Sequence, residues 1–500
     1  MSDTVSIVAA IIGGFILLYG LTSLVIKEKL YLSEASVAIL CGIIFGPLCA
    51  NFIDVSEWGD EVTITKEFSR IVIGIQVMAA GVALPKKYLY KELKSILVLL
   101  GPVMVWMWLS SGLFVWVLIP GLNFTEALMI AACFTPTDPV LANSIVHGKF
   151  AEKHVPLHVR QIISCESGAN DGLGYPFLFI AVYLLQMDST GAAIGKWAYW
   201  IMGYNVILSC IIGFAAGYVA RKLLQLSEQR RLIDKESILV FSVALALFLM
   251  GTIGLIKSDD LLACFVAGNS FTWDDWFRIE TEKSHMIEPW SLFHDISIQI
   301  DLWRLLVLAL LVLLFRRLPV VLTLYKFIPA VRTWREAVFT GWFGPIGVGA
   351  IFYYSIALES LPIDGPNAHA REVLKPIIYF MVLTSVITHG ITIPLFYIGT
   401  FATRTLTRTS ESGGIRVLRI PKIGRKNTPP ISVDTDISEA SAIQDNEDVE
   451  PTQRHTTITI LTPDQRPNLT APEKNLSELP TSFTAENHTN NTADNSTRYL

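Results

Sequence analysis

The chain has 500 residues and a net charge of −5; 52% of the residues are hydrophobic and 17% are charged, against roughly a quarter in soluble proteins. The apolar residues gather in blocks of about 20, the length that a helix needs to cross a bilayer, which excludes an ordinary soluble protein. No phosphate-binding glycine loop, Ser-His-Asp pattern or metal-binding cysteine spacing occurs. We therefore expect neither an ATP-driven pump nor an enzyme, no cofactor and no nucleic-acid partner.

The apolar blocks predict transmembrane helices, because backbone polar groups in lipid must be satisfied within the spanning segment. Lys and Arg concentrate in alternate short loops between these blocks. This bias predicts an N-terminus outside and a C-terminal tail in the cytoplasm. In chain order, the predicted helices are 7–26, 33–53, 68–84, 95–119, 124–146, 161–186, 197–220, 237–256, 260–272, 302–324, 336–358 and 374–398.

The alternation of basic loops fails at residues 284–301. The predicted helices on both sides of this stretch end on the cytoplasmic side, so the chain needs one more crossing between them. The stretch holds His285, Glu288, His294 and Asp295, and it is too short and too polar to span a bilayer. Either a helix is missing from the sequence, which a gene-model error would explain, or the C-terminal half is inserted differently; we favour a missing helix.

The composition predicts three parts of the chain. Residues 1–400 are predicted to form a transmembrane domain with that gap, and residues 401–426 a basic juxtamembrane segment. Basic segments beside a membrane are attracted to anionic lipid, so this segment is expected to contact membrane lipid. Residues 427–500 are rich in Thr, Ser, Asn, Pro and Glu and are predicted to be a disordered cytoplasmic tail.

The predicted helix 124–146 contains a motif that a continuous helix does not accommodate. Two prolines flank an aspartate there, so the helix is predicted to break and to leave carbonyls and hydroxyls free beside a carboxylate. Many transporters build ion sites from such broken helices near the middle of the membrane. The alternative is a proline kink with a structural aspartate. The motif is Thr135-Pro136-Thr137-Asp138-Pro139.

The predicted helix 161–186 carries two carboxylates and an amide within about one and a half turns. Glu166 and Asn170 share one face, and Asp171 lies about 100° round the axis. Burial makes a carboxylate hold its proton more tightly, whereas a bound cation favours its release. One carboxylate can then carry a proton or a cation but not both, which is the basis of antiport. The alternative is a structural polar network between helices.

Charged residues also occur at the ends of two later helices. Asp259 and Asp260 begin helix 260–272, where they could line the outer mouth of an ion path or simply end a solvated loop. Arg316 and Arg317 end a helix at the inner side, where they could anchor the topology. Alternatively, one arginine turns inward and pairs with Glu166, since an unpaired buried carboxylate is costly.

Two features near the C-terminal end of the apolar region carry a weaker signal. His389 in the last predicted helix is more typical of a packing residue than of a proton relay. A glycine series with one proline indicates close helix packing or a flexible segment. That series is Gly341, Gly344, Pro345, Gly347 and Gly349.

Taken together, these motifs resemble those of the fungal plasma-membrane Na⁺/H⁺ antiporters, which belong to the monovalent cation:proton antiporter family. The resemblance covers about residues 1–425, and the combination of motifs is highly specific. It departs from the family at 284–301, where relatives carry an aromatic-rich helix. The matching motifs are Phe134–Ala142, Glu166–Gly172, Ser258–Ala263, Phe315–Pro319 and Gly341–Gly347.

The resemblance implies an all-α, polytopic fold of about 12–13 helices, with inverted repeats and two crossed, broken helices at the ion site. It also implies a homodimer and an elevator-like movement of the ion-binding helices against the dimer domain. By position, Asp171 is implied to carry the cation and the proton, and Na⁺ is expected to be held by Asp171, Asp138 and Thr135.

The same resemblance implies supporting roles for other residues. Asn170 is expected to complete the site, together with the segment from Thr135 to Pro139. Glu166 is expected to form an ion pair with Arg316 in preference to Arg317. The remaining residues implicated in transport are Asp259 and Asp260.

The predicted function is therefore export of Na⁺ and Li⁺, and of K⁺ in some relatives, in exchange for H⁺ at the plasma membrane. Such activity serves salt tolerance, cation homeostasis and pH regulation. Two other functions stay open. A cation channel would use the same acidic residues without protonation, and a non-transporting salt sensor or inactive paralogue would fit the absent helix.

Overall fold

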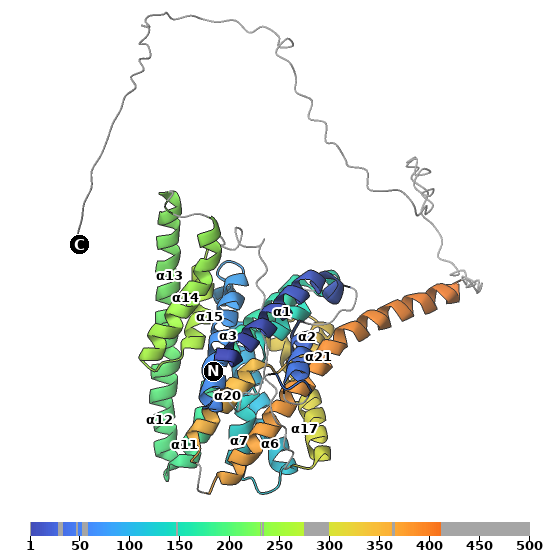
Figure 1. Ribbon diagram of the computed structural model, residues 1–500. Coiled ribbons are helices and arrows are strands. Elements are labelled where there is room, and N and C mark those ends of the chain that lie inside the picture. Colours follow the sequence, from blue (N-terminus) through green and yellow to red (C-terminus); the bar gives the residue numbers. More distant parts are fainter. Residues whose placement is uncertain are drawn as a thin grey trace, which may run out of the picture. The chain divides into compact units, whose positions relative to one another are not determined.

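The computed structural model describes residues 2–28, 34–46, 49–52, 59–146, 149–230, 232, 235–274, 300–362 and 366–411. All the regular secondary structure in these residues is helical, as the sequence predicts (Figure 1). The tail at 427–500 lies outside the described residues, and so does nearly all of the predicted gap at 284–301. The last helix continues to Glu411, past the predicted boundary at residue 400.

Several of the longer helices are divided into consecutive shorter segments. Up to residue 186, they are α1 Ser2–Glu28, α2 Glu34–Phe45, α3 Glu61–Ala83, α4 Tyr88–Lys91, α5 Leu93–Val98, η2 Leu99–Val103, α6 Met104–Leu118, α7 Phe124–Cys133, α8 Pro139–Val146, α9 Lys149–His154, α10 Leu157–Gly172 and α11 Gly174–Gln186. From residue 190 they are α12 Thr190–Lys196, η3 Trp197–Ile207, α13 Leu208–Gln229, α14 Lys235–Leu255, α15 Asp260–Phe271, α17 Leu302–Phe315, α18 Leu318–Leu324, η4 Tyr325–Phe327, α19 Trp334–Trp342, α20 Val348–Ser360 and α21 Ala368–Glu411.

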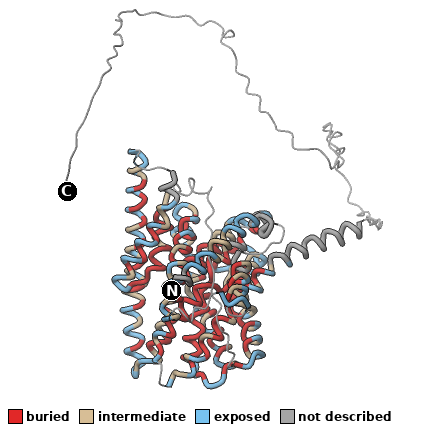
Figure 2. The backbone as a smooth tube through the Cα atoms, viewed as in Figure 1, coloured by how far each residue is buried: buried red, intermediate tan, exposed pale blue. Residues whose placement is uncertain are grey.

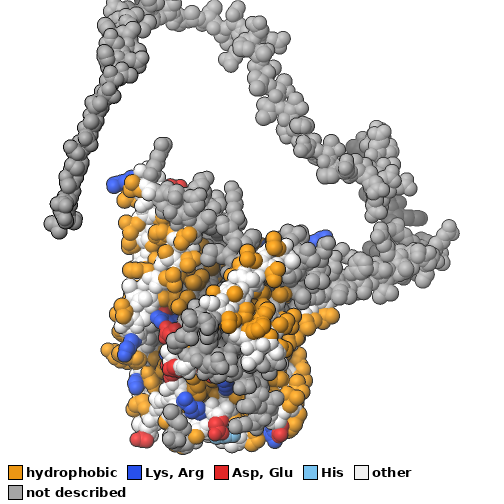
Figure 3. Space-filling view, viewed as in Figure 1, with side chains coloured by type: hydrophobic (Ala, Val, Ile, Leu, Met, Phe, Trp, Pro, Cys, Tyr) orange, Lys and Arg blue, Asp and Glu red, His pale blue; other side chains and the backbone are white. Residues whose placement is uncertain are grey.

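Among the described residues, four helical stretches are long and apolar enough to cross a membrane: Leu93–Leu118, Thr190–Gln229, Leu302–Phe327 and Ala368–Thr392. Large hydrophobic side chains are exposed on these helices, including Trp106 and Leu113 on α6 and Ile211 on α13. Hydrophobic side chains also cover much of the face seen in Figure 3, including α13. A helix surface of this kind is suited to lipid rather than to water.

Two sets of helices pack together. In one set, α15 contacts α3, α13 and α14; in the other, α7 contacts α6, α11, α20 and α21. Helix α20 joins the sets, because it contacts both α7 and α3, and α10 packs on α3 and α15 of the first set and on α8. The buried residues in Figure 2 follow these inner helices. The joining helices carry several of the polar residues that the sequence singles out.

Two helices are interrupted in the interior. The first interruption, between α7 and α8, spans residues 134–138 and confirms the break predicted at the two prolines. The second, between α19 and α20, spans residues 343–347 and lies inside the segment that the sequence predicts as one continuous helix, 336–358. The resemblance implies two broken helices, but the predicted span did not locate this break, which arises because Gly344, Pro345 and Gly347 interrupt the helix in a segment that is otherwise apolar.

Candidate ion-binding site

Asp138 joins the two helix breaks. Its amide donates a hydrogen bond to the carbonyl of Pro345 in the other break, at 2.9 Å. Its Oδ1 accepts from the amides of Val140 (2.9 Å) and Leu141 (2.8 Å) at the start of α8. Its Oδ2 accepts from the amide of Val348 at the start of α20, at 3.1 Å. Free amides at a helix N-terminus carry partial positive charge, so this one carboxylate stabilises two helix ends.

Arg316 forms hydrogen bonds at the opposite ends of the same broken helices, the C-terminal ends of α7 and α19. Its guanidinium donates to the carbonyl of Phe134, just after α7, and to the carbonyl of Gly344, just after α19. Carbonyls at a helix C-terminus carry partial negative charge, which a buried cation offsets. The two breaks, residues 134–138 and 343–347, meet at these contacts, and we call this place the crossing. The partial charges of the helix ends are balanced there, because a carboxylate binds two positive ends and a guanidinium binds two negative ends.

The partner of Glu166 differs from the expected one. Glu166 forms a buried ion pair with Arg317 through both carboxylate oxygens, and not with Arg316. Arg317 is held further by a hydrogen bond from its Nε to the carbonyl of Thr340, at 2.9 Å. Arg316 is not free for Glu166, because the carbonyls of the two helix breaks hold its guanidinium. Both arginines are buried, whereas the sequence predicts that one of them turns inward.

Asn170 and Thr137 form a closed pair of hydrogen bonds across the first break. The amide of Thr137 donates to Asn170 Oδ1 at 3.1 Å, and Asn170 Nδ2 donates to Thr137 Oγ1 at 2.8 Å. Thr135 Oγ1 donates to the carbonyl of Ala131 in the last turn of α7, at 2.8 Å. The two bonds between Asn170 and Thr137 fix α10 against the unwound segment 134–138, which contains Pro136 and is followed by Pro139.

Asp171 is the exception in this bonded region. It is 1% exposed, and neither of its carboxylate oxygens has a hydrogen-bond partner in the described part of the chain. Its carboxylate lies against the first turn of α20, because a Cβ added to Gly349 would sit 2.6 Å from Asp171 Oδ1. The Asp138 carboxylate approaches the same segment two residues earlier, because a Cβ added to Gly347 would sit 2.0 Å from Asp138 Oδ2. A buried carboxylate without a partner is costly, so this group is suited to hold a proton or a cation.

Two residues that the sequence analysis missed hold this arrangement in place. The Tyr353 hydroxyl on α20 donates to the carbonyl of Asp171, which lies in the last turn of α10. Ser385 Oγ on α21 accepts from the amide of Ile346 in the second break, at 2.8 Å. Tyr353 looks like an ordinary apolar position in the sequence. The Gly-Pro-x-Gly run was the available signal for the second break.

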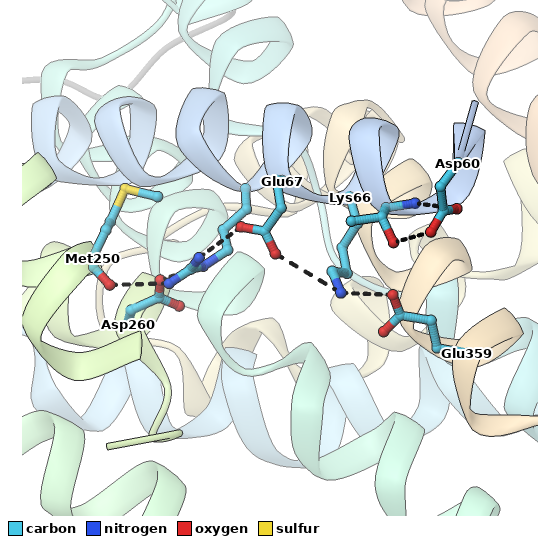
Figure 4. Close-up of polar contacts among 8 residues, drawn as sticks. Asp60, Lys66, Glu67, Met250, Asp260 and Glu359 are labelled. Carbon is cyan, nitrogen blue, oxygen red and sulfur yellow. Dashed lines mark hydrogen bonds and ion pairs between the residues drawn. The ribbon is translucent and has the colours of Figure 1, made fainter. Parts of the chain in front are cut away.

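Asp259 and Asp260 are buried at the start of α15 rather than solvated. Asp260 forms an ion pair with Arg70 on α3, with Nε and Oδ2 2.7 Å apart. Figure 4 shows this end of α3, where polar contacts extend from Asp260 past Glu67 and Lys66 to Glu359 on α20. The solvated-loop alternative does not fit this burial.

His389 lies beside the second break. Its ring packs against Trp342, with ring centroids 6.0 Å apart, and against Phe343, at 6.1 Å. The side chain is buried, and its Nδ1 has no hydrogen-bond partner among the described residues. These contacts give it a packing environment beside the second break.

Known proteins resemble this chain over most of its length. It is 41% identical to a probable Na⁺/H⁺ antiporter of Schizosaccharomyces pombe, over 87% of this chain and 62% of the relative. It is 41% identical to a Na⁺/H⁺ antiporter of Saccharomyces cerevisiae, over 80% and 44% respectively. A further Na⁺/H⁺ antiporter of S. pombe is 33% identical, over 84% of this chain and 97% of the relative. The chain therefore spans about half to two thirds of the first two relatives.

The fold has counterparts among solved structures. A structure of the sodium proton antiporter MjNhaP1 from Methanocaldococcus jannaschii superposes with a TM-score of 0.57 at 16% identity, over 76% of this chain and 95% of the other. An electron-microscopy structure of the same protein gives 0.56 at 15% identity, over 79% and 97%. At these identities the likeness concerns the fold alone.

A family model described as the transmembrane sodium/hydrogen exchanger matches residues 14–398. This range includes both helix breaks and all the acidic residues described above. The chain therefore belongs to the sodium/hydrogen exchanger family of multi-pass membrane proteins.

Proposed function

We propose that this protein is a secondary active antiporter that exchanges Na⁺ or Li⁺ for protons at Asp171. The observation that carries the proposal is the buried carboxylate of Asp171, which has no hydrogen-bond partner among the described residues, whereas Asp138, Asn170 and Glu166 are bonded. An ionised carboxylate in such a place needs a counter-charge, and a proton or an alkali cation can supply it.

The fixed charges around the site support exchange rather than simple binding. Arg316 and Arg317 are held by helix carbonyls and by Glu166, and the Asp138 carboxylate is held by helix amides. These groups keep their bonds whether Asp171 holds a proton or a cation. Only the state of Asp171 then changes in the cycle, so that binding one ligand displaces the other.

Alkali cations bind to oxygen ligands, and the site offers several. The carboxylate of Asp171 is the proposed main ligand, with Asp138 and the Thr135 and Thr137 oxygens near the unwound segment as further candidates. K⁺ is a proposed additional substrate, in keeping with the resemblance to the fungal antiporters.

The setting of the activity is also proposed. We place the protein in the plasma membrane as a homodimer, with the N-terminus outside and the C-terminal tail in the cytoplasm. Exchange at that membrane would export Na⁺, driven by protons that enter down their own gradient. This export would serve salt tolerance and pH regulation. In the proposed movement, the helix set around α7 would shift against the set around α15, and the contact of α20 with α3 lies between the two sets.

The experiment compares the full-length chain with Asp171→Asn in sealed vesicles that contain a pH-sensitive dye. A pulse of NaCl or LiCl is expected to move protons across the vesicle membrane in the wild type and not in the variant. Asparagine retains the size of the side chain but cannot alternate between a proton and a cation. Proton movement in the variant at the wild-type rate would overturn the proposal.

The matched control is Glu126→Gln. Glu126 is a buried carboxylate on α7, but it is bonded in a helix cap, where it accepts from the amide of Asn123 at 2.8 Å. This variant is expected to exchange ions as the wild type does. A cation flux through the wild-type protein that is independent of the proton gradient would favour a channel. A wild type that neither exchanges ions nor rescues a salt-sensitive host would favour the sensor or inactive paralogue.

A further inference from the structure

Two ion pairs join the helix sets at one end of the protein. Lys66 on α3 contacts Glu359 at the end of α20, with Nζ and Oε1 2.6 Å apart. Lys375 on α21 contacts Glu61, the first residue of α3, and the two atoms are 2.9 Å apart. Helix α3 belongs to the set around α15, whereas α20 and α21 belong to the set around α7. Both ion pairs therefore cross the boundary between the sets, and Figure 4 shows the first of them.

The helices on each side of these ion pairs are fastened to their own set. On α3, the Nε of Arg70 donates to Oδ2 of Asp260 on α15, at 2.7 Å. At the end of α20, Gln186 on α11 donates from its side-chain amide to the carbonyl of Ser360, at 2.7 Å. The ion pairs thus connect two bodies that are each braced internally, close to where the pairs attach.

The packing between the sets does not by itself fix their relative position. Helix α20 packs on α3, and its buried residues, which run from Val348 to Leu358, are nearly all apolar. Apolar packing is non-directional, so it can stabilise more than one relative position of two helices. An ion pair instead needs two atoms at a short separation. The two pairs therefore favour one position of the sets over the others.

The ion pairs lie on the outer side of the proposed exchange site. The carboxylate of Asp171 lies against Gly349 in the first turn of α20, and Glu359 lies roughly 15 Å further along the helix, at 1.5 Å per residue. The loop after the other end of α3 is basic, so the positive-inside bias predicts that the ion pairs face the outside. Helix α10, which carries Asp171, packs on both α3 and α15. A route from the outside to Asp171 between the sets therefore passes the ion pairs. The lysines of the basic loop are Lys86, Lys87, Lys91 and Lys94.

We propose that these two ion pairs, Lys66 with Glu359 and Lys375 with Glu61, form a latch that closes the outer route to Asp171 and opens in every exchange cycle. The latch deepens the proposed function and rests on it, since it requires exchange at Asp171 and movement between the sets. Its four side chains are between 21% and 42% exposed. Partly exposed ion pairs are weak, because water solvates the charges once they separate. The latch can therefore favour the closed position without trapping the protein in it.

The first experiment measures exchange by the full-length chain in sealed vesicles whose outer face meets the bath, at several bath Na⁺ concentrations. Glu359→Lys replaces attraction by repulsion, so the outward-open state should be populated more. The bath Na⁺ concentration that gives half-maximal exchange is then expected to fall, by up to about five-fold for one exposed ion pair. Glu61→Lys should act in the same way. Combining Lys66→Glu with Glu359→Lys should restore the wild-type value, because the pair forms again with its charges reversed.

The matched control is Asp301→Lys. Asp301 pairs with Arg304 in the first turn of α17, at 3.1 Å, and its side chain is 64% exposed. This change reverses the same charge in a pair that does not link the sets. A positive surface charge repels Na⁺, so on that ground alone both variants would need more bath Na⁺. Asp301→Lys is therefore expected not to lower the half-maximal concentration. An unchanged or raised value in Glu359→Lys would overturn the latch, and so would a lowered value that Lys66→Glu does not reverse.

The second experiment measures the outer opening without transport. Thr63 on α3 and Asp188 after α11 are exposed, and spin labels on Thr63→Cys and Asp188→Cys report the distance between the sets, in a full-length chain whose six native cysteines are replaced by alanine. In lipid nanodiscs, Glu359→Lys is expected to add a population at longer distance, which the reversed pair should remove. Distances identical to those without Glu359→Lys would overturn the latch, whatever the vesicle assay shows for Asp171. The two proposals can thus fail independently.

Discussion

The crossing of the two helix breaks and the start of α15 each hold two buried carboxylates. In each place, one carboxylate is bonded to a guanidinium or to helix amides, and the other keeps at least one oxygen without a hydrogen-bond partner among the described residues. At the crossing, Asp138 bonds to the amides of two helices, whereas the Asp171 carboxylate has no hydrogen-bond partner in the part of the chain that the structure describes. At α15, Asp260 pairs with Arg70, whereas Asp259 keeps one oxygen unbonded. All four residues are at most 2% exposed. Burial alone therefore does not separate structural carboxylates from candidate ligands; the bonding of each oxygen does.

The two regions differ in how their charges are held. At the crossing, charged side chains bond to helix ends and to each other in full burial, as Arg317 does with Glu166. Along α3, the pair of Lys66 and Glu359 is partly exposed. When one member of a buried ion pair is removed, the other charge stays buried without compensation. When one member of an exposed pair is removed, water solvates the remaining charge. Stability should therefore depend far more on the crossing.

The largest stability effect is expected for Arg317→Met. This change leaves Glu166 buried without its partner, which should lower the free energy of unfolding by about 3–5 kcal/mol. The effect can be measured as thermal unfolding of the purified protein, followed by tryptophan fluorescence. The double variant Glu166→Gln with Arg317→Met should be more stable than the single one, because no uncompensated charge remains. A single variant as stable as the wild type would contradict the contrast between the two regions.

A smaller effect is expected for Tyr353→Phe. The change removes the donor to the carbonyl of Asp171 and leaves that buried carbonyl unpaired, at a cost of about 1–3 kcal/mol. Because this bond holds the backbone of Asp171, the concentration of Na⁺ that gives half-maximal exchange should rise as well. Vesicle exchange at several Na⁺ concentrations measures it. Lower stability with unchanged Na⁺ dependence would limit Tyr353 to a structural role.

The smallest effect is expected at the exposed end of α3. Lys66→Gln should change the free energy of unfolding by less than about 1 kcal/mol, because its partner Glu359 is 42% exposed and water replaces the lost contact. Glu359→Gln should behave in the same way, and high salt should reduce both effects. A loss comparable with that of Arg317→Met would show that the row of ion pairs is as important as the crossing.

The residue pattern located the first break but not the second, although the resemblance implies two, and this difference has a physical reason. Pro136 and Pro139 remove amides and clash with a helix, so their effect is local and readable. The second break has one proline and several glycines, and glycine permits both close packing and an irregular backbone. The contacts between the breaks, such as that of the Asp138 amide with the Pro345 carbonyl, join residues more than 200 positions apart. No local pattern reveals such a partner.

By itself, the sequence determined that this protein is helical and apolar, where its first break lies, and which costly carboxylates it contains. These properties follow from composition and from short-range backbone sterics. Only the tertiary structure decided that Arg317 rather than Arg316 pairs with Glu166, that Asp138 caps two helices, and that Asp171 and Asp259 keep unbonded oxygens. Whether a buried group has a partner depends on which distant helix packs against it.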